Sequence, residues 1–161
     1  MLSWDRQKDG KLANNVVKAL MIGDVIGQPG LKALFAGLGP LVRSTKADIV
    51  IANGENSMGG FGIGKEEADK LFSIGVQVIT TGNHVWERPG SAELLAATPR
   101  LLRPANYPPG AAGTGTAVLE AGGAVWAVLN LQGREGMTRA VGKIGGKPGP
   151  NTISFSGQCP A

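Results

Sequence analysis

Three short polar stretches could carry chemistry in this 161-residue sequence. Asp24, Glu55 and the pair Asn83-His84 each follow an apolar run, and His84 is the only histidine in the chain. Carboxylate, amide and imidazole groups suit a hard or borderline divalent cation such as Mn²⁺, Fe²⁺ or Zn²⁺. A carboxylate can bridge two such ions, as in many phosphoryl-transfer sites. The residue types therefore predict a metal site, provided that the fold brings these stretches together.

Each of these residues also has an ordinary structural interpretation. Asp24 could cap a helix or serve a turn. Asn56, beside Glu55, could adopt a left-handed backbone in a turn. A lone histidine in a Gly-Asn-His loop is more often structural than catalytic. The functional interpretation is favoured only jointly, because turn requirements alone would seldom place such residues after all three apolar runs.

The elements that must position these residues follow from the apolar pattern. Strands are indicated at 15–23, 48–53 and 76–81, and each is followed by a loop and a helix, at 31–42, 65–73 and 91–97. In the first helix Gly39-Pro40 marks a kink or division, Gly75 is expected to stop the second helix, and Ser91 is a candidate N-cap of the third.

Three consecutive strand–loop–helix units predict parallel strands joined by right-handed crossovers. The loops at the carboxyl ends of such strands emerge on one edge of the sheet, where ligands bind. Further strands are indicated at 101–104, 116–120 and 124–131, the last two joined around 121–123 as a hairpin. The expected fold class is therefore α/β, a parallel βαβαβα arrangement followed by a β-hairpin and an irregular tail.

Composition limits the class of protein further. No stretch approaches the roughly 20 apolar residues that span a bilayer, and the first fifteen residues are too polar for a signal peptide. The single cysteine, Cys159, fits a reducing compartment. We therefore expect a cytoplasmic protein without a membrane segment. Most of the net charge of +4 lies from Arg134 onward, which makes a basic nucleic-acid-binding face a weak hypothesis.

Five motifs together resemble one protein family. They are GDVIGQPG, IANGENSMGGFGI, ITTGNHVWE, PRLLRPANYPPG and NLQGR, in this order between about residues 16 and 134. As a set they resemble the YmdB-type branch of the calcineurin-like metallophosphoesterases. The resemblance implies a metallophosphoesterase-type α/β sandwich, two divalent metal ions (Fe, Mn or Zn), and hydrolysis of phosphodiesters such as 2′,3′-cyclic nucleotides.

The resemblance also implies roles for individual residues. Asp24 corresponds to a ligand of the first metal, Glu55 to the carboxylate that bridges both metals, and Asn83 to a ligand of the second. His84 corresponds to the catalytic imidazole, which protonates the leaving alkoxide or stabilises charge on phosphorus. Asn56 would contact the phosphate. Trp86, in contrast, is expected to pack beneath the loop as core.

The sequence also departs from the family. Family members continue for roughly another hundred residues and supply three further histidine ligands, whereas this chain has no second histidine. We therefore expect an incomplete site with one metal or none, and weak or absent activity. The change of character after Arg134 resembles a truncation or a shifted reading frame. The expected organisation is a polar extension at 1–14, a partial metallophosphoesterase domain at 15–134 and an irregular Gly/Pro-rich tail at 135–161.

Two alternatives to an enzyme stay open. One is a non-catalytic remnant with a single weak cation site or none. The other is a nucleotide- or RNA-binding module whose glycine-rich loops hold phosphate. In each case a parallel sheet without its second half leaves an uncovered edge and apolar surface, which predicts self-association or a protein partner.

Overall fold

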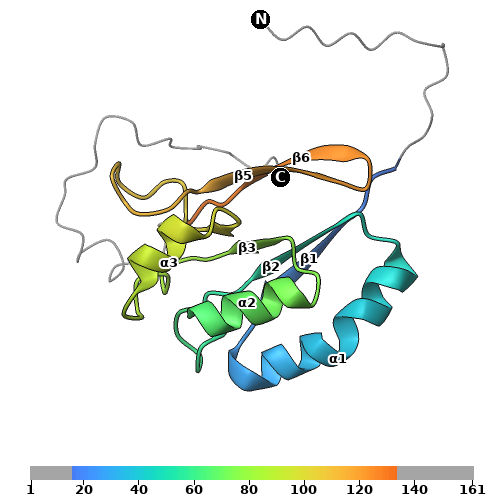
Figure 1. The fold of residues 1–161 in the computed structure, drawn as a ribbon, viewed down its shortest axis with the longest axis horizontal. Coiled ribbons are helices and arrows are strands. Elements are labelled where there is room, and N and C mark those ends of the chain that lie inside the picture. The colour runs from blue at the N-terminus through green and yellow to red at the C-terminus, as the bar shows by residue number, and fades with distance from the viewer. Residues whose placement is uncertain (1–15, 134–161) are drawn as a thin grey trace, which may run out of the picture.

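The computed structural model describes residues 16–133, which form an α/β structure with two sheets. The larger sheet is parallel, in the order β1-β2-β3-β4, and the smaller is the antiparallel pair β5-β6. Figure 1 shows α1 and α2 on one face of the parallel sheet and the β5–β6 hairpin on the other. The strands are β1 (Ala19–Asp24), β2 (Ile49–Asn53), β3 (Val78–Thr80), β4 (Leu101–Leu102), β5 (Thr116–Ala121) and β6 (Ala124–Leu129), and the helices are α1 (Gly27–Thr45), α2 (Lys65–Ser73) and α3 (Ser91–Ala97).

This arrangement confirms the predicted fold class of parallel βαβαβα followed by a hairpin. The predicted extension at 1–14 and tail at 135–161 lie outside the described residues. None of the helices between residues 16 and 133 is long and apolar enough to cross a membrane.

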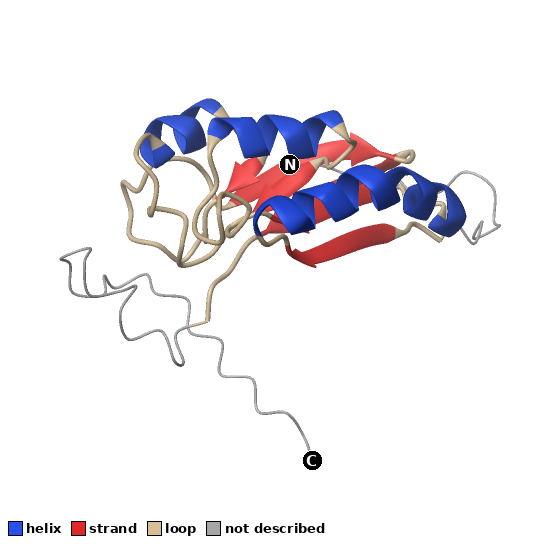
Figure 2. Ribbon diagram, turned by 90° about the horizontal axis from the view of Figure 1, so that it is seen from below, coloured by secondary structure: helices blue, strands red, loops and turns tan. Residues whose placement is uncertain are grey.

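β2 is apolar from Ile49 to Ala52 because both of its faces are covered. Val50 and Ala52 join the core under the helices, whereas Ile49 and Ile51 join a second core under the hairpin. Figure 2, seen from the helical side, shows α1 and α2 lying across the strands. The parallel sheet is thus the middle layer, between the helices and the hairpin.

The first two helices keep their predicted faces but differ in extent. α1 begins at Gly27, ahead of the predicted start at Leu31, and runs through Pro40 to Thr45 without division. Pro40 removes the hydrogen bond to the carbonyl of Ala36. Both residues are exposed, so water can bind that carbonyl. Of the kink or division expected at Gly39-Pro40, the division was therefore wrong. α2 ends before Gly75, whose φ of 103° is left-handed, as predicted for the stop.

α3 shows a second departure, at its first turn. The N-cap is Gly90, with a left-handed φ of 79°, and no side chain caps the helix. Ser91 is instead the first helical residue, and its hydroxyl donates to the carbonyl O of Arg88 at 2.6 Å. The predicted N-cap role of Ser91 was wrong by one position because the glycine before it supplies the turn.

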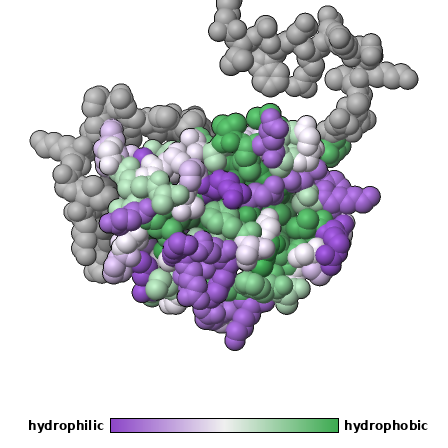
Figure 3. Space-filling model, viewed as in Figure 1, coloured by the Kyte–Doolittle hydropathy of each residue, from purple (hydrophilic) through white to green (hydrophobic). Residues whose placement is uncertain are grey.

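The hairpin closes the other face of the sheet. Its two-residue turn is Gly122-Gly123, with φ of 56° and 74°, which suits a type I′ connection. One face of the hairpin covers the second core through Leu119 and Trp126. The opposite face is exposed and largely apolar, with Val118 73% exposed. Figure 3 shows hydrophobic residues in green along the top of the molecule, where Figure 1 places the hairpin.

A buried amide fastens the end of the hairpin to the parallel sheet. Nδ2 of Asn130, just after β6, donates to the carbonyl O of Thr81 at 2.7 Å and to that of Leu102 at 3.0 Å. These carbonyls follow β3 and end β4. The hairpin is therefore joined to the strand ends from which the predicted site residues emerge.

Candidate functional site

Asp24 and Asn56 meet across the ends of β1 and β2. Nδ2 of Asn56 donates a 2.7 Å hydrogen bond to Oδ2 of Asp24. Asp24 does not cap α1, because the N-cap of that helix is Ile26 and no side chain caps it. Asn56 does not have a left-handed backbone, since Lys46 is the only non-glycine residue with positive φ between 16 and 133. The helix-cap interpretation of Asp24 and the left-handed backbone expected for Asn56 were therefore wrong, although Glu55 and Asn56 do lie in a turn.

Glu55 is held in place from two directions. Oδ1 of Asn53 accepts from the Glu55 backbone N at 2.9 Å, and Nδ2 of Asn53 donates to Oε1 of Glu55 at 3.2 Å. The other carboxylate oxygen, Oε2, accepts from the backbone N of His84 at 3.4 Å. A Cβ on Gly82 would stand 2.4 Å from this oxygen, so any other residue here would require the carboxylate or the loop to shift. The loop after β3 is thus built around Glu55.

His84 is the residue whose backbone N donates to Glu55. Asn83 lies between it and Gly82 in the same loop. Nδ1 of His84 is 3.8 Å from Oε1 of Glu87, and the side chain is partly exposed. The imidazole meets the ring of Phe61 in a T-shaped contact, with centroids 5.1 Å apart. Asp24, Asn56, Glu55 and His84 therefore lie along one edge of the sheet, linked by the contacts of residues 55 and 56.

The donor chemistry of this cluster fits a divalent cation. Oδ1 of Asn56 and Nδ1 of His84 are buried without a hydrogen-bond partner, a condition that a bound cation or polar ligand relieves. Together with two carboxylates they offer the oxygen and nitrogen ligands that Mn²⁺, Fe²⁺ and Zn²⁺ accept. However, no group of three or more His, Cys, Asp and Glu side chains within residues 16–133 is arranged to hold a metal ion.

Three residues that were not predicted also position groups at this edge: Tyr107, Gln132 and Asn53. The Tyr107 hydroxyl donates to Oε1 of Gln132 at 3.0 Å and lies 3.4 Å from the carbonyl O of Gly82. Burial, and secondarily the negative charge of Glu55, raises the pKa of Tyr107 above its usual 10.0. Asn53 is the third, through its two bonds to Glu55. Sequence offered only one signal for them, their presence in the family-like motifs.

Trp86 packs under the loop, as predicted. It lies against the core below the helices and meets Tyr107 in a T-shaped contact with centroids 6.1 Å apart. Its position beneath the loop supports Asn83 and His84 from the core side.

Comparison with known proteins adds sequence relatives. A family model described as YmdB-like protein matches residues 20–144, which extends past Arg134, where a change of character was expected. A 2′,3′-cyclic-nucleotide 2′-phosphodiesterase of Bacillus subtilis (strain 168) is 37% identical over 118 residues, which cover 73% of this chain and 45% of that protein. A putative phosphatase/phosphodiesterase of Mycoplasma pneumoniae is 32% identical over 123 residues, 74% of this chain and 44% of that protein.

Solved structures give the same picture. A hypothetical protein from Thermus thermophilus superposes with a TM-score of 0.65 at 39% identity, covering 72% of this chain and 45% of that one. A novel phosphatase from Mycoplasma pneumoniae superposes with a TM-score of 0.67 at 31% identity, covering 73% and 43%. The present chain thus spans about half the length of the relatives that it matches.

Proposed function

Because the chain belongs to the YmdB-like family, we propose that it carries part of a metal-dependent phosphodiesterase site for 2′,3′-cyclic nucleotides or related phosphodiesters. The observation that carries this proposal is the set of contacts at the strand ends, from Asp24 through Asn56 and Glu55 to His84. Two carboxylates, two amides and an imidazole at one edge are the groups that hydrolysis of a phosphate ester needs. A turn or an apolar core would not need all of them.

In this proposal Asp24 would help to hold a first metal, Asn83 would help to hold a second, and Glu55 would serve both. A divalent cation held there would supply positive charge for the phosphate oxygens and would acidify a water molecule. Asn56 sits beside Asp24, and its Nδ2 would be the group that donates to a phosphate oxygen.

His84 would provide the proton in this reaction. Hydrolysis adds water to phosphorus, breaks the bond from phosphorus to the ester oxygen, and leaves an alkoxide that must be protonated. The imidazole of His84 is partly exposed at the edge of the sheet, and its backbone N is held by Glu55. A general acid needs such a fixed position close to the leaving oxygen.

We propose further that the chain alone binds one cation or none and has negligible activity. This follows from the single histidine of the chain and from the absence, within residues 16–133, of a group of three acidic or imidazole ligands. Two carboxylates are too few to hold two metals well. In the chain alone, the bound water would then not be acidified enough to attack at neutral pH.

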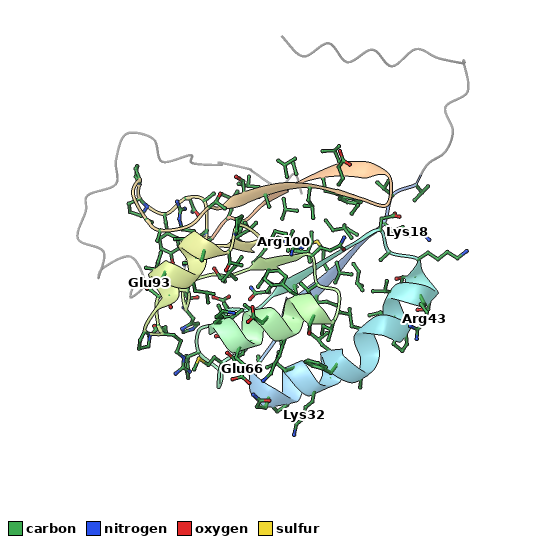
Figure 4. All side chains as sticks on the ribbon, in the orientation of Figure 1. Lys18, Lys32, Arg43, Glu66, Glu93 and Arg100 are labelled. Carbon is green, nitrogen blue, oxygen red and sulfur yellow. The ribbon has the colours of Figure 1, made fainter. Side chains whose placement is uncertain are left out.

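Metal content and turnover test this function. The purified chain is loaded with Mn²⁺, dialysed and analysed for bound metal, and hydrolysis of bis-p-nitrophenyl phosphate and 2′,3′-cyclic AMP is measured. We expect at most one equivalent of metal and no turnover, with turnover restored when the remaining half of a relative is fused after the matched segment. That restored activity should be lost in His84→Ala and retained in Glu93→Gln, which alters an exposed carboxylate on α3 (Figure 4).

Other outcomes would point to the alternatives. Zero metal and no recovery on fusion would favour a non-catalytic remnant. Binding of nucleotides without metal or turnover would favour a phosphate-binding module. Robust turnover by the chain alone, lost in His84→Ala, would show that other residues complete the site.

We also propose that the chain associates with a second copy of itself. The exposed face of the hairpin is apolar at Val118, Val125 and Leu129, and Met21 on β1 is 73% exposed. β1 is also an edge of the described sheet. Apolar surface beside an open strand edge favours association.

A further inference from the structure

Phe61 is an exposed aromatic side chain beside the proposed general acid. Its side chain is 58% exposed, and its ring meets the His84 imidazole at an interplanar angle of 72°. Phe61 belongs to neither apolar core of the described residues. Single exposed apolar residues are common on protein surfaces, so exposure alone gives Phe61 no role. A role in ligand binding depends on its position next to His84 and on how firmly the backbone holds it.

The turn that carries Phe61 is fixed by Arg88. Nε of Arg88 donates to the carbonyl O of Phe61 at 2.6 Å, and Nη2 donates to the carbonyl O of Met58. Arg88 lies in the same loop as His84, after β3, whereas Phe61 and Met58 lie in the loop after β2. One guanidinium therefore connects these two loops. Met58 is itself exposed and lies on the same turn, which gives this side of the site an apolar rim.

Glycines make this close approach possible. Gly59, Gly60 and Gly62 have φ of 65°, 92° and 75°, in the left-handed region that other residues disfavour. A Cβ on Gly62 would stand 2.7 Å from Cγ of Arg88. The backbone is thus shaped to bring the guanidinium against the turn and to present the Phe61 ring outward.

We propose that Phe61 is the stacking platform for a planar ring that the substrate carries, a nucleobase in a nucleotide ester. A ring held next to the proton donor and open to solvent can stack on a base without first ordering a flexible loop. Stacking accepts any base, because every base has a π-face. This inference rests on the proposed function for the choice of phosphate ester, but it concerns only recognition of the ring.

Binding of two small ligands tests the platform without need of turnover. Adenosine 5′-monophosphate and ribose 5-phosphate share a phosphorylated sugar and differ in the base. Their dissociation constants are measured by NMR titration of the full chain with Mg²⁺ present. We expect the base-bearing ligand to bind about tenfold more tightly, and the largest shifts to fall on the signals of Phe61 and His84.

Variants separate stacking from folding. Phe61→Ala should bring the ratio of the two constants close to one while binding of ribose 5-phosphate stays unchanged, and Phe61→Trp should restore the preference. Phe35→Ala is the matched control, because Phe35 is 51% exposed on α1, about 12 Å of helix away from Gly27 at the start of that helix. It should keep the wild-type ratio.

The inference is overturned if the wild-type chain shows no preference for the base-bearing ligand, or if Phe61→Ala keeps the preference. It stands independently of catalysis. A Phe61-dependent preference in a chain that stays inactive even when fused to the remaining half of a relative would remove the proposed function and leave the platform. Phosphodiester hydrolysis by the fused chain with no Phe61-dependent preference would do the reverse.

Discussion

Nδ2 of Asn56 lies 2.7 Å from Oδ2 of Asp24, and this hydrogen bond joins the ends of the first two parallel strands at the candidate site. The amide of Asn56 donates a hydrogen bond to one oxygen of the Asp24 carboxylate. It therefore competes with any cation for the same oxygen, and changes of either residue should appear directly in metal affinity.

Substitution at this pair should shift Mn²⁺ binding in opposite directions. Asn56→Asp places a second carboxylate beside Asp24, and two close carboxylates attract a cation. Asp24→Asn removes the charge. We expect affinity to rise about tenfold in the first variant and to fall about tenfold in the second, as measured by electron paramagnetic resonance of free Mn²⁺. Equal affinity in both variants and the wild type would show that this pair binds no metal.

Gly82→Ala should disturb the site through sterics alone. The new Cβ would stand 2.4 Å from Oε2 of Glu55, so the carboxylate or the loop must move. We expect the free energy of unfolding to fall by about 1–3 kcal/mol, measured by urea denaturation. Gly37→Ala is the control, since nothing lies within 4 Å of its Cβ in α1, and it should stabilise by roughly 0.5–1 kcal/mol. A neutral Gly82→Ala would mean that Glu55 is free to move.

Tyr107 should titrate above its ordinary pKa. Burial is the main cause and the charge of Glu55 the second. Tyr107 is the only tyrosine in the chain, so the ultraviolet absorbance of its phenolate reports this group alone. Glu55→Gln should lower the pKa partway toward 10.0, with the contribution of burial left in place. A pKa that does not respond to Glu55→Gln would place the two groups further apart than described.

The same shift makes stability depend on alkaline pH. The folded state binds the phenolic proton more tightly than the unfolded state, so this contribution is complete below pH 10.0 and is lost as pH rises through the folded pKa. Tyr107→Phe should remove that part of the alkaline decline, seen as a flatter dependence of the free energy of unfolding on pH above 10. An identical dependence in both proteins would contradict the shift.

Charges on the outer face of the hairpin should disrupt self-association. Val118→Lys with Leu129→Lys adds two ammonium groups to an exposed apolar face. We expect a shift toward monomer in analytical ultracentrifugation. Ala33→Lys, at an exposed position of α1 on the opposite side of the parallel sheet, should leave the association unchanged. Wild-type protein that is monomeric at all concentrations would contradict the proposed association.

The parallel architecture could be predicted because it depends on local pattern. Apolar runs of six to nine residues, interrupted by glycine-rich loops, predict three strand–loop–helix units, and parallel topology then places Asp24, Glu55 and His84 on one edge. The division at Pro40 could not be judged from sequence, because it depended on exposure of a carbonyl.

What sequence could not supply were contacts between loops. Arg88 binds carbonyls about thirty residues earlier, and Tyr107 reaches Gly82 from beyond α3. Neither residue follows a strand or belongs to a periodic face, so no local rule selects them. Such residues decide how firmly the chemically obvious groups are held.

Asn130 couples the motion of the hairpin to that of the parallel sheet. Its amide reaches the carbonyls of Thr81 and Leu102 at once, and Thr81 directly precedes the loop of Gly82, Asn83 and His84. Anything that stiffens this loop must also restrain the base of the hairpin through that amide. Amide protons of β6 should accordingly exchange with deuterium more slowly when a ligand occupies the loop. Exchange in the hairpin can thus report on ligand binding at the strand ends of the parallel sheet.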